Sequence, residues 1–74
     1  MNNVQDQMNE WHLELKNVLS EHQNELNNAT ELIKDNQYIA AFNYVDSIIA
    51  KNNVKTSERF KDITTDLYLS LNSL

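Results

Sequence analysis

The chain of 74 residues contains no glycine and no proline, and this absence restricts its fold more than any other feature. The tight turns of β-hairpins rely on residues that adopt positive φ, chiefly glycine, and many other turns rely on proline. A small β-rich domain needs several such turns, whereas helices joined by short polar segments need none. The chain is therefore predicted to be all-α. Glycine-rich phosphate-binding loops are excluded for a related reason, because they need close approach of the backbone to the phosphate.

Apolar residues recur at spacings of three and four from Val4 to Ile33, which is the pattern of one buried helical face. They predict a long N-terminal helix over residues 3–34. A second helix is predicted over residues 37–52 and a third over 56–72, so residues 1–74 form a single domain, either a small helical hairpin or a three-helix bundle. The pair Asn27-Asn28 is a candidate interruption of the first helix. Without glycine or proline at residues 51–57, the second and third helices could also be continuous.

A chain of this length supports only a thin core, and it has no cysteine with which to build a disulfide. Small domains of this kind often gain stability by forming oligomers, so a homodimer is expected. The candidates for the core or the dimer interface are Trp11, Leu15, Phe42, Tyr68 and Leu71. Trp11 has a second candidate role as an anchor for a partner protein. Leu13, by contrast, is expected to lie among acidic residues, outside the core.

Charge is unevenly distributed along the chain. The formal net charge is −5, and residues 1–50 hold eight acidic and two basic side chains. On a continuous first helix, steps of four residues separate carboxylates by about 6 Å, which is comparable with successive phosphates on a nucleic-acid strand. A helix flank on which all charges are negative predicts binding to a basic surface. The alternative interpretation is a solvated surface whose charge only keeps the protein soluble. The predicted acidic flank consists of Asp6, Glu10, Glu14, Glu21, Glu25, Glu31 and Asp35.

Catalytic and metal-binding patterns are weak. Glu21, His22 and Glu25 could be read as metal ligands, but di-iron helical bundles use Glu-x-x-His pairs on two helices. Here the order is His-x-x-Glu and it occurs once. His22 is therefore interpreted as a partly buried interfacial residue and His12 as an exposed one. No nucleophile stands in an arrangement with a general base, so neither enzymatic activity nor a metal or other cofactor is expected.

The acidic balance also disfavours binding to nucleic acids and to anionic membranes, both of which select basic surfaces. The longest apolar stretch, YIAAF at residues 38–42, is too short to span a bilayer, and no basic segment precedes an apolar run. A cytoplasmic protein is expected, located in the bacterial host cytoplasm if a phage encodes it.

Twelve of the 74 residues are asparagine, a bias typical of an AT-rich genome. In size, acidity, helicity and asparagine content, the whole chain resembles the small host-takeover proteins of phages that infect low-GC bacteria, including inhibitors of the bacterial DNA sliding clamp. The resemblance is one of class, and no individual residue is carried over. It implies a protein that blocks the DNA channel of the clamp, prevents clamp loading and arrests host DNA replication. The competing interpretation is a structural or regulatory helical adaptor that packs its apolar stripe against a partner protein.

Overall fold

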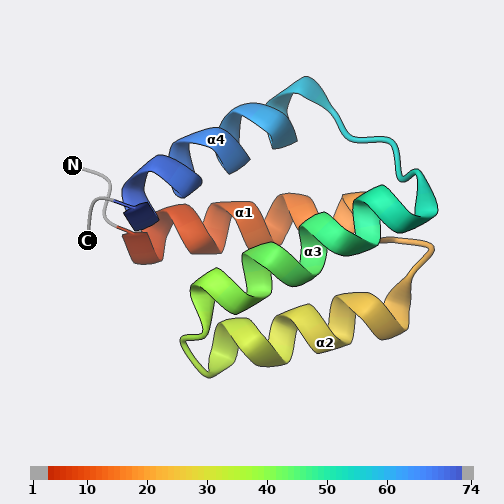
Figure 1. Cartoon of the computed structure of the whole chain (residues 1–74), viewed down its shortest axis with the longest axis horizontal. Coiled ribbons are helices and arrows are strands. Elements are labelled where there is room, and N and C mark those ends of the chain that lie inside the picture. Colours follow the sequence, from red (N-terminus) through yellow and green to blue (C-terminus); the bar gives the residue numbers. More distant parts are fainter. Residues whose placement is uncertain (1–3, 73–74) are drawn as a thin grey trace.

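The computed structural model describes residues 4–72. This range contains no strand and four helices, namely α1 (Val4–Val18), α2 (Gln23–Lys34), α3 (Tyr38–Asn52) and α4 (Glu58–Asn72). Successive helices run in opposite directions, and α1 packs against α4 while α2 packs against α3 (Figure 1). A smaller contact joins α1 to α2. The all-α prediction is confirmed, although the bundle has four helices rather than three. None of the four helices combines the length and the apolar character that a membrane crossing requires.

The single helix predicted over residues 3–34 is wrong, because the chain reverses direction between α1 and α2. Leu19 is fully buried at this turn, and its carbonyl oxygen accepts a hydrogen bond from the His22 N–H at 2.9 Å. A straight helix over residues 3–34 would be about 48 Å long, whereas α3 and α4, of 15 residues each, span about 22 Å. Those two helices could cover only half of its apolar stripe. The reversal lets both halves of the stripe share one core. Asn27-Asn28, the candidate interruption, lies within α2 and is exposed.

The second and third predicted helices match α3 and α4, and they are separate. Asn53 ends α3 in the left-handed conformation at φ 51°, which asparagine tolerates better than most residues other than glycine. The N–H of Val54 then donates to the carbonyl of Ile49 at 3.0 Å. At the start of α4, the Phe60 N–H donates to the Ser57 Oγ at 3.1 Å, as expected for a helix cap. These contacts define a short loop in place of a continuous helix.

The core draws apolar side chains from all four helices and from the α1–α2 turn. Trp11 lies at its centre, 1% exposed, with its ring stacked between those of Phe42 and Phe60 at centroid distances of 5.7 and 6.1 Å. The fully buried small residues Ala29 and Ala41 belong to the same cluster, and on α2 and α3 they permit a close approach of these helices. The buried core residues are Met8, Trp11, Leu15, Leu19, Leu26, Ala29, Ala41, Val45, Phe60, Leu67 and Leu71.

Candidate functional site

The seven carboxylates predicted to share one flank do not share a helix. Asp6, Glu10 and Glu14 lie on α1, Glu21 lies in the turn that follows, and the remaining three belong to α2 and its C-terminal cap. Because α2 folds back against α1, the regular four-residue step is interrupted after Glu14. The continuous acidic flank on one long helix is therefore wrong, and its break follows directly from the α1–α2 turn. Partner binding by these residues stays a prediction.

Arg59 on α4 brings two of these carboxylates together. Its Nε donates to Glu14 Oε1 at 2.6 Å and its Nη2 donates to Glu10 Oε1 at 3.1 Å. The Glu14 side chain is 22% exposed, whereas those of Glu10 and Arg59 are 47% and 65% exposed. Ion pairs this accessible contribute little to stability, because water and salt compete for both partners. The contacts do establish which side of α4 borders which side of α1.

An acidic face extends from these contacts over α1 and α4. Asp62 and Asp66 follow Arg59 by three and seven residues, which places all three on one side of α4. Both aspartates are exposed, as are Asp6 and Glu10 on α1. We define the α1–α4 acidic face as Asp6, Glu10, Glu14, Asp62 and Asp66 together with Arg59. Five carboxylates and one guanidinium give this face a formal charge of −4, against −5 for the whole chain.

Asp62 and Asp66 were missed by sequence reasoning because the last third of the chain has a nearly balanced charge. The spacing of Arg59, Asp62 and Asp66 was nevertheless visible in the sequence. The sequence did not indicate that α4 packs beside α1 (Figure 1). Only this packing brings the two aspartates to the same surface as Glu10 and Glu14.

The acids of α2 lie apart from this face. Glu31 pairs with Lys34 on its own helix at 4.0 Å, and Asp35 forms the C-terminal cap of α2. Glu21 is exposed in the α1–α2 turn, and Glu25 is partly buried in the first turn of α2. These four residues form a separate set, whose charge is useful as a control for the α1–α4 acidic face.

Both histidines are partly buried in the bundle. His12 is partly buried between α1 and α2, not simply exposed as predicted, and its Nε2 lies 2.9 Å from Thr30 Oγ1. Since the Thr30 hydroxyl donates to the Leu26 carbonyl at 2.8 Å, Nε2 of His12 is the donor in this pair. Burial lowers the pKa of His12, and the positive charges of Lys16 and Lys34 lower it further. Both effects favour the neutral form of the His12 imidazole in the folded chain.

His22 is partly buried, as predicted, at the N-terminal end of α2. It borders a pocket of about 330 Å³ between the α1–α2 turn and the α3–α4 loop, together with Glu21 and Lys55. Within residues 4–72, no group of three His, Asp or Glu side chains is placed so that it could hold a metal ion. The side chains that line the pocket beside His22 include both acidic and basic groups, so they do not indicate one class of ligand.

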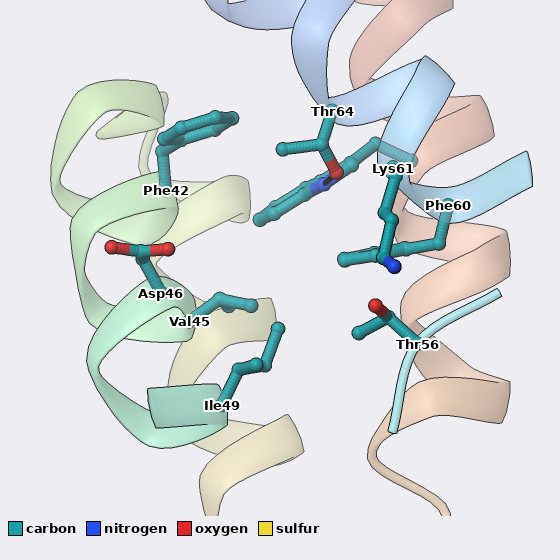
Figure 2. Close-up of a pocket in the computed structure, with 9 residues that line it drawn as sticks. Phe42, Val45, Asp46, Ile49, Thr56, Phe60, Lys61 and Thr64 are labelled. Carbon is teal, nitrogen blue, oxygen red and sulfur yellow. Dashed lines mark hydrogen bonds between the residues drawn. The ribbon is translucent and has the colours of Figure 1, made fainter. Parts of the chain in front are cut away.

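An apolar groove separates α3 from α4. It contains a pocket of about 150 Å³ that is lined by Trp11 of α1, by Phe42, Val45 and Ile49 on the α3 side, and by Phe60 and Thr64 on the α4 side. Figure 2 shows the α3 and α4 walls of this pocket. Two exposed charged residues also line it, one on each wall: Asp46 from α3 and Lys61 from α4. Trp11, Val45 and Phe60 are nonetheless buried, so the apolar side chains of the pocket that a ligand or partner can reach are the partly buried Phe42 and Ile49.

The five residues predicted for the core or a dimer interface fall into two groups. Trp11, Leu15 and Leu71 are buried within the single chain, and the Trp11 Nε1 also donates to Thr64 Oγ1 at 3.0 Å. Tyr68 is half exposed and stacks on the partly buried Phe42 at a centroid distance of 5.5 Å, next to the groove. Leu13 is 64% exposed, as predicted. Only Phe42 and Tyr68 are therefore accessible to a second molecule.

Comparisons of the chain with protein-family models, with curated protein sequences and with solved structures found no match.

Proposed function

We propose that the chain is a non-enzymatic inhibitor that binds, through its α1–α4 acidic face, the basic DNA-binding surface of a DNA-handling protein. The proposed target is the DNA channel of a bacterial sliding clamp, whose occupation would prevent clamp loading and arrest host DNA replication. The observation that supports this proposal is the clustering of five carboxylates around a single arginine on the adjoining sides of α1 and α4, a set whose formal charge is −4. The clamp as target comes from the resemblance to phage host-takeover proteins.

Several properties of the face suit a charged partner. Carboxylates one helical turn apart on α1 lie about 6 Å apart along the axis, so basic side chains that contact successive phosphates meet charges at a similar spacing. Arg59 restrains Glu10 and Glu14, which reduces the conformational entropy that they would lose on binding. Its own ion pairs are accessible enough for a partner's arginine or lysine to compete with them.

The second candidate is a structural or regulatory adaptor that packs its apolar surface against a partner protein. The observation that favours it is the apolar groove between α3 and α4. The two functions differ in their response to salt. Binding through the acidic face weakens sharply with ionic strength, because charges are screened over about 10 Å at 0.1 M salt. Binding through an apolar groove barely responds.

The experiment measures binding of the purified full-length chain to a purified sliding clamp from a low-GC Gram-positive bacterium, by isothermal titration calorimetry at low and raised salt. Two variant pairs test the acidic face: Glu10→Lys with Glu14→Lys, and Asp62→Lys with Asp66→Lys. The second pair leaves both contacts of Arg59 intact. A matched control, Glu31→Lys with Asp35→Lys, changes the net charge equally but lies outside the acidic face.

We expect each acidic-face pair to weaken clamp binding by at least about tenfold, which corresponds to about 1.4 kcal/mol. The α2 control should change it by less than about threefold, and duplex DNA should compete with the chain for the clamp. All variants should retain the far-ultraviolet circular dichroism of a helical bundle. Equal weakening by all three pairs would show that net charge alone matters and would contradict a defined acidic face. If neither acidic-face pair weakened clamp binding, or if clamp binding resisted raised salt, the adaptor function would be favoured.

A further inference from the structure

The side of the bundle between α3 and α4 is less closely packed than the α1–α4 and α2–α3 sides. The α1–α4 and α2–α3 pairs are closely packed, whereas an apolar pocket lies between α3 and α4 (Figure 2). Phe42 on α3 lines this pocket and stacks on Tyr68 of α4. Trp11 contributes to both the core and the lining of the pocket.

Apolar side chains on this side are only partly covered by their own chain. Ile39 is 49% exposed and lies one turn before Phe42 on α3, and Tyr68 is 50% exposed. Phe42 and Ile49 are partly buried. We define these four residues, together with Asp46 and Lys61, as the groove face. Of the four, Phe42 and Ile49 line the pocket, while Ile39 lies one turn from Phe42 and Tyr68 stacks on Phe42. Scattered apolar residues are ordinary on a protein surface, whereas exposed apolar residues gathered beside a pocket are typical of an interface.

The charges of the groove face decide which occupant fits. Asp46 on α3 and Lys61 on α4 line the same pocket from opposite walls, so they stand at the same level along the groove. A two-fold axis parallel to the groove places α3 of one copy opposite α4 of the other and preserves this level. Asp46 then faces Lys61 of the second copy, Lys61 faces Asp46, and Phe42 faces Tyr68. An axis across the groove would instead set like charges opposite each other.

We propose that the groove face is a homodimer interface, in which two copies meet about a two-fold axis parallel to α3 and α4. In this arrangement each α3 runs antiparallel to the facing α4, as neighbouring helices do within the chain. The two aromatic pairs and the half-exposed isoleucines become buried, which extends the thin core of a 74-residue chain. The acidic face lies on the opposite flank of α4, so both copies keep it accessible. The dimer is independent of the proposed function.

The test is a charge-exchange cycle measured by sedimentation equilibrium of the full-length chain over a wide concentration range. Asp46→Lys or Lys61→Asp alone sets two like-charge pairs across the interface, one at each symmetric position. We expect each single variant to weaken dimerisation by at least about tenfold. The double variant, Asp46→Lys with Lys61→Asp, re-forms both opposite-charge pairs with reversed sign and should recover most of the dimerisation of the unmodified chain.

Matched controls separate this geometry from a general charge effect. Asp62→Lys changes the net charge as Asp46→Lys does, and Lys51→Asp changes it as Lys61→Asp does. Both residues are exposed and point away from the groove face, Lys51 by about half a turn from Phe42. Neither control should alter dimerisation by more than about twofold.

Three results would overturn the proposed interface: a chain that stays monomeric at all concentrations, single variants that dimerise as the unmodified chain does, or a double variant that fails to recover. Far-ultraviolet circular dichroism verifies that each variant is folded. None of these results bears on clamp binding through Glu10 and Glu14, because neither glutamate belongs to the groove face.

Discussion

The hydrogen bond between Trp11 and Thr64 offers a direct test of the packing at the centre of the bundle. The Trp11 Nε1 is 3.0 Å from Thr64 Oγ1, and the indole is 1% exposed. Thr64→Val keeps the shape of the side chain and removes the acceptor, which leaves a buried N–H without a partner. Such a group costs about 1–3 kcal/mol. A chain of this length is stable by roughly 4–11 kcal/mol, so the change is a substantial fraction of the total.

The assay is urea denaturation followed by far-ultraviolet circular dichroism. With a slope of about 1 kcal/mol per molar urea for a small protein, Thr64→Val should lower the midpoint by about 1–3 M. Thr64→Ser retains the hydroxyl and should lower it by less. In Trp11→Phe the donor is absent, so adding Thr64→Val to that variant should have little further effect, giving a coupling energy of about 1–3 kcal/mol. Additive effects of the two substitutions, or a Thr64→Val midpoint equal to that of the unmodified chain, would refute the reasoning.

Two further predictions concern local features of the fold. Because the pKa of His12 is lowered in the folded chain, protonation favours unfolding: the stabilisation is complete above a pH of about 6.5 and is lost as the pH falls towards the folded-state pKa. Urea denaturation between pH 7.5 and 5.5 should show this loss and His12→Gln should remove it; an equal slope in both would contradict the assignment. At Asn53, with φ 51°, Asn53→Ala should lower the free energy of unfolding by about 1 kcal/mol and Asn53→Gly should not. Thermal denaturation checks this pair, and equal effects of alanine and glycine would contradict it.

The helical class and much of the core could be predicted from sequence because they depend on local rules. The spacing of three and four residues identified Trp11 and Leu15 as inward-facing, and both are buried. The same reasoning placed Leu13 outside the core, where it is 64% exposed. A position on a helix is determined by the helix itself, at about 100° per residue, so these predictions needed no knowledge of the neighbouring helices.

The candidate surfaces were less accessible to sequence reasoning, because each joins residues far apart in the chain. Arg59 lies 45 residues from Glu14, and nothing between them indicates that they pair. Asp46 and Lys61 also come from different helices, and only the fold places them on opposite walls of one pocket. A single sequence indicates on which side of its helix a side chain lies, but it does not indicate which residue of another helix packs against that side.

The sequence by itself determined an acidic, all-helical chain with amphipathic segments, since the lack of glycine and proline and the apolar spacing act within one turn of backbone. The tertiary structure alone decided that the apolar stripe of residues 4–33 is divided at the buried Leu19. Local propensity permits a straight helix there, but only a reversal lets Trp11 and Ala29 enter one core. The gain in buried apolar area outweighs the helical hydrogen bonds lost at the turn. That reversal also separated the acids of α2 from those of α1 and left α4 to complete the acidic face.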